Sequence, residues 1–281
     1  YAILYSIIPN TQIKGGYMKF LKNKTVIIII IVFFAFLIGT FVVINKTKDL
    51  SMHNINKNDI KKYSLDITGD TDTTAAFQKM VNSYPSGTAI KLPEGEYSLK
   101  GTVKLPDGIK LVAEDKVILI GSGKNTLFSV GNDNSFEDIE FQNCATSLNV
   151  DQKKGLKVTN CRFTSKIDYA AINLSGAKDS SITNSYFYDI RKYGILIDRD
   201  SSNITIDKNN FDNDKIFGGY KKEQISGHVY CLNGTNIKVT NNILQNSGGQ
   251  GLIFGFNSTT GKGTTNSVAS NNKCIGNGQE G

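Results

Sequence analysis

The feature that most constrains this chain is a repeat of 24 residues with no room for a helix. The segment 158–163 recurs as 182–187 and, more loosely, as 206–211, so that their phenylalanines stand 24 residues apart. Each repeat holds at least two short β-like runs joined by an asparagine-rich turn. Propeller blades would need about 40 residues per repeat. The spacing therefore predicts a parallel β-helix, an all-β solenoid whose turns stack at roughly 4.8 Å.

Proline usage agrees with a stack of backbone-paired turns. Pro106 is the last proline of the chain, and proline lacks the N–H that each turn would donate to its neighbour. We interpret the recurrent asparagines as a stacked turn ladder, because asparagine tolerates a left-handed backbone. They are Asn143, Asn160, Asn184 and Asn241, and a second set of strands recurs between them at 147–150, 170–174, 193–198, 227–232 and 250–254.

Cysteine and histidine do not form a metal-binding pattern. There is no Cys-x-x-Cys spacing, and His53 and His228 are the only histidines, so a zinc site is not expected. We interpret Cys144 and Cys161 as small buried groups at equivalent ladder positions, with a disulfide as the less favoured alternative. The other two cysteines, Cys231 and Cys274, are expected to face inward.

An apolar run near the N-terminus predicts a membrane anchor. Residues 26–44 are apolar except for one glycine and one threonine, which is long enough for a transmembrane helix. No small-residue cleavage motif follows, so we favour an uncleaved signal anchor over 18–50 against a cleaved signal peptide, with the rest outside a bacterial cell membrane. We interpret 1–17, before the first methionine, as a translated leader or a disordered segment, and the polar segment 51–62 as a linker.

The segment after the linker predicts a short capping helix. Apolar residues between 76 and 84 fall on one helical stripe that ends at Pro85. Residues 69–78 read Gly-Asp-Thr-Asp-Thr-Thr-Ala-Ala-Phe-Gln, and 92–97 read Leu-Pro-Glu-Gly-Glu-Tyr. These two motifs resemble the opening of the pectate-lyase-like superfamily of right-handed parallel β-helix proteins. The resemblance implies that fold for residues 63–281.

Charge excludes one class of partner. The net charge of +7 is carried entirely by residues 1–63, and basic and acidic side chains balance in the remainder. The body therefore has no positive field to attract nucleic acid. The resemblance instead implies a polysaccharide partner, since the superfamily includes polysaccharide lyases, glycoside hydrolases and uronan epimerases. It assigns no catalytic residue, because the motifs that match are architectural.

The strands that precede the repeated turn are the candidate binding face, because their connections are irregular. The longest interruption, 212–226, comes directly before one of these strands. Alternation predicts outward side chains at Asn173, Leu196, Asp198, His228, Tyr230 and Ile253.

These residue types suit uronic-acid chemistry. Arg199 or a bound Ca²⁺ would neutralise the substrate carboxylate, and His228 or Tyr230 would act as base or acid. Asp198 would bind a cation or orient the histidine, and Asn173 and Tyr193 are candidate substrate contacts. Alternatively, Asp198 and Arg199 form a surface pair and the histidine is incidental.

Two hypotheses follow. The first is a membrane-anchored extracellular enzyme acting on a polysaccharide, as a lyase or epimerase or as a glycoside hydrolase; hydrolysis would pair Asp198 with Asp168 or Asp189. The second is a non-catalytic β-helix that binds glycan or serves as a cell-surface stalk. Because 277–281 repeats the lead-in to an apolar strand, we also expect the chain to be truncated within the coil. The oligomeric state is left open.

Overall fold

The computed structural model describes residues 51–213 and 227–278. The predicted leader (1–17), signal anchor (18–50) and membrane helix (26–44) lie outside the described residues. In the part of the chain that is described, no helix has the length and apolar character needed to cross a membrane.

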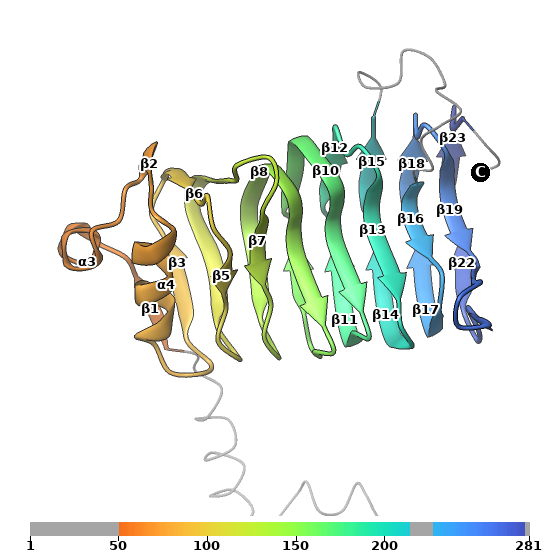
Figure 1. Cartoon of the computed structure of the whole chain (residues 1–281), viewed down its shortest axis with the longest axis horizontal. Helices are drawn as coiled ribbons and strands as arrows, with labels where there is room; N and C mark the ends of the chain where they lie inside the picture. The colour runs from red at the N-terminus through yellow and green to blue at the C-terminus, as the bar shows by residue number, and fades with distance from the viewer. Residues whose placement is uncertain (1–50, 214–226, 279–281) are drawn as a thin grey trace, which may run out of the picture. The chain divides into compact units, whose positions relative to one another are not determined.

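Three ladders of parallel strands wind around one interior (Figure 1), which confirms the predicted parallel β-helix. Between residues 89 and 254, each cycle of the chain contributes a strand to each ladder, and successive equivalent strands pair with one another. The repeated sequence motif spans two of these strands, because the backbone bends sharply at its asparagine. We call the three ladders I, II and III.

Each ladder is defined by its strands. Ladder I contains β1 (Met52–Asn54), β3 (Ala89–Leu92), the first parts of β6 (Lys110–Ile120) and β8 (Ser135–Asp151), β9 (Lys157–Thr159), β11 (Lys178–Thr183), β14 (Ser201–Asp207), β17 (Gly234–Thr240) and β22 (Val268–Ser270). Ladder II contains β2 (Thr68–Asp72), β4 (Gly95–Ser98), later parts of β6 and β8, the first part of β10 (Arg162–Ser175), β12 (Tyr186–Tyr188), β15 (Asn210–Asp212), β18 (Ile243–Gln245) and β23 (Lys273–Ile275). Ladder III contains β5 (Val103–Lys104), β7 (Thr126–Ser129), the last parts of β8 and β10, β13 (Tyr193–Asp198), β16 (Gly227–Cys231) and β19 (Gln250–Phe254).

The interior is a stack of like side chains. Phe141, Phe163, Phe187 and Phe211 are fully buried, and their ring centroids follow one another at 4.9, 4.7 and 4.2 Å in nearly parallel planes. This spacing is close to the distance between paired strands, so one ring sits above the next in successive turns. The 24-residue period thus places three of these rings, Phe163, Phe187 and Phe211, one above the next.

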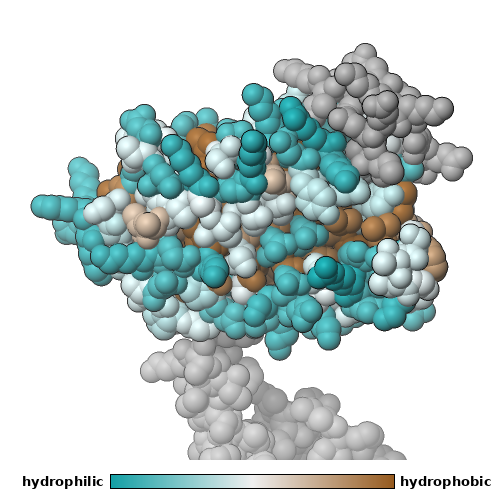
Figure 2. Space-filling view, in the orientation of Figure 1, coloured by the Kyte–Doolittle hydropathy of each residue, from teal (hydrophilic) through white to brown (hydrophobic). Residues whose placement is uncertain are grey.

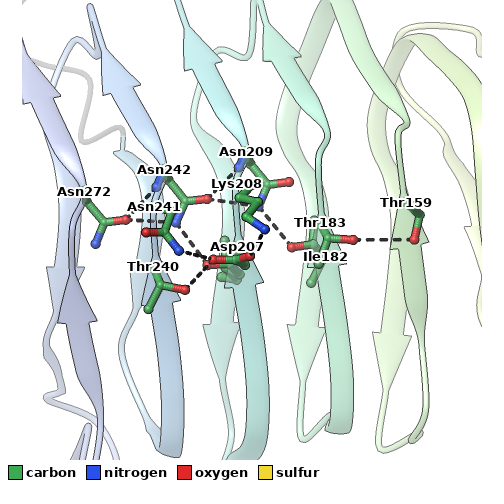
Figure 3. Close-up of polar contacts among 11 residues, drawn as sticks. Thr159, Ile182, Thr183, Asp207, Lys208, Asn209, Thr240, Asn241, Asn242 and Asn272 are labelled. Carbon is green, nitrogen blue, oxygen red and sulfur yellow. Dashed lines mark hydrogen bonds and ion pairs between the residues drawn. The ribbon is translucent and has the colours of Figure 1, made fainter.

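The corner between ladders I and II carries the asparagine ladder (Figure 3). Asn160, Asn184 and Asn241 have positive φ there, as predicted. Figure 3 shows Asn241 at this corner. The next residue in each turn points inward: the side-chain oxygen of Asn242 accepts the backbone N–H of Asn209 at 2.8 Å, and its amide donates to the Ile206 carbonyl at 3.0 Å.

The placement of Asn143 in this ladder is wrong. Asn143 lies at the corner between ladders II and III, where its side-chain amide donates to the carbonyl of Gly121. Consequently Cys144 and Cys161 occupy different corners and do not stack on each other. Both are buried and free, as is Cys231. Cys274 is exposed in the last described turn, but it pairs in register with the buried Leu244 and points inward, as expected.

The N-terminal end of the coil is covered as predicted. Helix α4 (Thr74–Asn82) buries Phe77, Met80 and Val81, and the Phe77 ring meets Phe128 edge to face at 6.0 Å. Residues 51–62 are not the linker that their polarity suggested.

This segment contains β1, which pairs with β3 and so extends ladder I, and the start of helix α3 (Lys57–Tyr63). A capping box between Asn56 and Asp59 begins that helix. Ile55 and Tyr63 are buried, so two apolar side chains fix a segment that is otherwise polar.

Candidate functional site

A groove of about 270 Å³ lies on the outer face of ladder III. Its floor is formed by equivalent positions of three successive turns, Asn149, Asn173 and Leu196. The amide of Asn173 donates to the side-chain oxygen of Asn149 at 2.8 Å, which orients both amides along the groove. Figure 2 shows that this face mixes polar side chains with an apolar patch toward its C-terminal end. The lining residues are Asn149, Asp151, Tyr169, Asn173, Ser175, Leu196, Asp198 and Arg199.

One wall of the groove is acidic. Asp151, Ser175 and Asp198 occupy the same position in three successive turns, so the backbones of the two aspartates are two turns apart, about 9.6 Å along the coil. Arg199 lies 3.9 Å from Asp151, and both side chains are more than half exposed. Asn257 donates its side-chain amide to both oxygens of Asp198, at 3.0 and 3.1 Å. The wall thus presents two carboxylates and one guanidinium to anything bound in the groove.

An aromatic cluster flanks the other side. The rings of Tyr169 and Tyr193 meet edge to face at 5.7 Å, and Tyr230 lies 5.1 Å from Tyr193. The ammonium of Lys192 sits 5.4 and 5.2 Å from the centroids of Tyr169 and Tyr193. Burial raises the pKa of Tyr193 to about 12, so its phenol stays protonated at neutral pH. Tyrosine faces beside aligned amides offer apolar and polar contacts together, which sugar rings need.

The predicted outward position of His228 is wrong. Its side chain is buried inside the coil, 5.4 Å from the Phe211 ring, with Nε2 at 2.7 Å from the Gln245 carbonyl oxygen. The equivalent position in the preceding turn is Gly194, where an added Cβ would collide with Phe211. Burial lowers the pKa of His228 to about 4, with the Gln245 bond and the charge of Asp212 acting in the opposite direction. His228 therefore does not face a substrate in the groove.

The remaining predicted residues divide into two groups. Asn173, Asp198 and Arg199 line the groove, and Tyr193 and Tyr230 lie beside it. Most of the long interruption at 212–226 lies outside the described residues.

The two carboxylates considered as partners of Asp198 are elsewhere. Asp168 forms a 3.1 Å ion pair with Arg191, and Asp189 accepts the backbone N–H of Lys166 at the corner between ladders II and III.

The residue that sequence reasoning missed is Asp151. It precedes Ser175 by 24 residues and Asp198 by 47, which is two repeats less one residue. Extending the repeat backward from Asp198 would have found it. Tyr169 and Asn257 had no such signal, because one lies at the irregular corner before ladder III and the other on a hairpin outside the repeat.

The described residues contain no group of three or more His, Cys, Asp or Glu side chains arranged to hold a metal ion. The guanidinium of Arg199 is the cation that lines the groove.

Comparisons with known proteins agree with the fold. The family described as "Right handed beta helix region" matches residues 114–281. Among solved structures, the ORF18 protein of Geobacillus virus E2 is 15% identical with a TM-score of 0.55, covering 84% of this chain and 51% of that one. An iota-carrageenase complexed to iota-carrageenan fragments is 16% identical with a TM-score of 0.51, covering 70% of this chain and 55% of that one.

An alpha-1,3-glucanase from Streptomyces thermodiastaticus is 15% identical with a TM-score of 0.54, covering 83% of this chain and 42% of that one. No curated protein matches the sequence. The chain spans about half the length of these solved structures, and at such identities the likeness concerns the fold.

Proposed function

Because this chain belongs to the right-handed β-helix family, we propose that it binds a polysaccharide along the outer face of ladder III and acts on it there. One observation carries the proposal: the groove has a floor of aligned amides, an acidic wall and an aromatic flank. Two solved structures of the same fold are named for enzymes that act on polysaccharides, the iota-carrageenase and the alpha-1,3-glucanase. We further propose that the apolar segment 26–44 anchors the protein at a bacterial cell surface.

Hydrolysis is the reaction that the groove supports best. Inverting glycosidases place two carboxyl groups about 6.5–9.5 Å apart, one as acid and one as base, with a water between them. The backbones of Asp151 and Asp198 stand two turns apart on one wall, about 9.6 Å along the coil, which is just above the upper end of that range. Ser175 lies between them at the same register and is small enough to leave room for a water and a glycosidic oxygen.

A lyase or epimerase is less well supported. Such a reaction needs a base beside the substrate carbon, and His228 is inside the coil. Arg199 would still neutralise a uronate, and Tyr230 would have to supply the base. This alternative differs from hydrolysis in its product, since elimination leaves an unsaturated uronate that absorbs ultraviolet light.

The test is a substrate panel with matched variants. Polygalacturonate, alginate, iota-carrageenan and alpha-1,3-glucan are incubated with the protein, and reducing ends and ultraviolet absorbance are both followed. Hydrolysis predicts new reducing ends without absorbance, and a loss of about 10²-fold or more in Asp151→Asn and in Asp198→Asn. Asp168→Asn, on the same coil but outside the groove, is the control and should keep its rate. Binding without any product would leave a glycan-binding protein, and rising absorbance would favour the lyase.

A further inference from the structure

The row of side chains that forms the groove floor continues past the groove. In register, Asn149, Asn173 and Leu196 are followed by Tyr230 of β16 and Ile253 of β19, so the row changes from amides to apolar side chains. We propose that Tyr230 forms a stacking subsite, at which the sugar next to the groove lies against the tyrosine ring. The proposal rests on the proposed function, because this sugar belongs to the glycan chain that the groove binds.

The packing around Tyr230 fixes the place of its ring. The ring centroid lies 5.1 Å from that of Tyr193, and a Cβ added at Gly227 would stand 2.9 Å from Cδ2 of Tyr230. The equivalent residue one turn before Gly227 is Tyr193, and Gly227 does not have a positive φ. Neither the repeat nor the backbone therefore requires glycine there, whereas the ring of Tyr230 does. Leu196 and Leu232 pack into the same outer cluster.

The hydroxyl groups distinguish these tyrosines from a tyrosine that only holds the coil. Tyr97 is fully buried, and its hydroxyl donates to the Pro93 carbonyl at 3.0 Å. In the part of the chain that the structure describes, the hydroxyls of Tyr193 and Tyr230 have no such partner. A tyrosine hydroxyl in a packed cluster usually has one. These two hydroxyls are therefore available to a polar ligand.

A sugar ring matches this chemistry. Its face carries C–H groups and its rim carries hydroxyls, and Tyr230 offers an apolar ring together with a hydroxyl. Tyr230 is partly exposed, so a ligand can reach it. Because successive turns are about 4.8 Å apart, Tyr230 lies one turn beyond Leu196 along the floor. A glycan chain that follows the floor therefore reaches Tyr230 directly after the groove.

The antiparallel hairpin of β20 (Phe256–Asn257) and β21 (Lys262–Gly263) contacts the wall of the groove rather than this row. Asn257 and Lys262 bond Asp198 and Asp200, respectively, at the end of β13 and just after it. These contacts do not involve Tyr230.

The experiment measures affinity against the length of the ligand. Oligosaccharides of increasing length, prepared by partial acid cleavage of each polymer of the panel, are titrated into the full chain by calorimetry. Tyr230→Ala should weaken the binding of oligosaccharides long enough to reach Tyr230 about tenfold, and leave the binding of shorter ones unchanged. Gly227→Ala should act in the same length-dependent way, because the ring must move away from the new Cβ. Tyr230→Phe keeps the ring and should cost about threefold.

The control is Tyr186→Ala, a partly buried tyrosine on ladder II, which should bind every length as the unchanged protein does. If Tyr230→Ala weakens all lengths equally or none of them, the subsite proposal is overturned and the proposed function stands. The same holds if Gly227→Ala binds every length as the unchanged protein does. If no oligosaccharide and no polymer binds the unchanged protein, both proposals are overturned.

Discussion

The corner between ladders I and II and the outer face of ladder III are made by the same cycles of chain, yet their side chains follow opposite rules. At the corner, each turn repeats one contact, in which a backbone N–H donates to the side chain one turn later: Cys161 to Ser185, Ser185 to Asn209, and Asn209 to Asn242. On the outer face, equivalent positions change from Asn173 to Leu196 to Tyr230 in three turns.

The difference separates the residues that hold the coil from those that serve a ligand. A contact repeated in every turn stabilises stacking and carries no information about a particular substrate. Side chains that vary from turn to turn do not repeat one stacking contact, and in the groove they bring together amides, carboxylates and aromatic rings. Substitutions should therefore affect stability in the first region and binding in the second.

The largest effect is expected from the interior stack. Phe187→Ala removes a fully buried ring between Phe163 and Phe211 and should lower the free energy of unfolding by about 3–5 kcal/mol. Urea denaturation followed by circular dichroism measures it. A loss below about 1 kcal/mol would mean that the stack does not hold the coil together.

The interior also predicts a pH dependence. The folded pKa of His228 is about 4, below its ordinary value of 6.5, so the unfolded chain takes up a proton before the folded one does. This contribution to the free energy of unfolding is complete above pH 6.5. As the pH falls toward 4 the contribution is lost, and the free energy of unfolding decreases by about 3 kcal/mol. The measurement compares urea midpoints of the protein and of His228→Gln across that range. If both lose stability in parallel, the buried histidine is not the cause.

The asparagine corner should give a smaller loss. Asn242→Ala leaves the Asn209 N–H and the Ile206 carbonyl without their side-chain partner inside the coil. This change should lower the free energy of unfolding by about 2 kcal/mol. The neighbouring Asn241→Gly is the matched control, because Asn241 is exposed and its positive φ suits glycine. Equal melting temperatures for the two variants would contradict the role assigned to the inward-facing asparagine.

The smallest effect on stability belongs to the groove. Tyr169→Ala removes a ring that is 39% exposed, so it should lower the free energy of unfolding by less than about 1 kcal/mol. The same change should weaken glycan binding about tenfold, since the ring flanks the bound chain. Isothermal titration and thermal melting of one preparation separate the two quantities. A large drop in melting temperature with unchanged affinity would place Tyr169 among the structural residues.

The difference between repeated contacts in the coil and varying side chains on its outer face also explains which features the sequence could predict. The phenylalanine period and the asparagine turns predicted the coil, because packing and backbone bonding repeat them over several successive turns. The direction of each side chain within a strand was harder to predict from the sequence. Simple alternation placed His228 outward, whereas His228 and Val229, two consecutive residues near the corner, are both buried. Tertiary contacts between distant segments, such as Asn257 with Asp198, have no periodic signal at all.

The central claim is that the outer face of ladder III is the binding surface. Hydrogen–deuterium exchange of the full chain, with and without a polysaccharide that binds, tests it most directly. We predict that protection on binding is centred on residues 149–151, 169–175 and 193–199, with little change at the corner between ladders I and II. Protection centred on ladder I or ladder II, with these three segments unchanged, would contradict it.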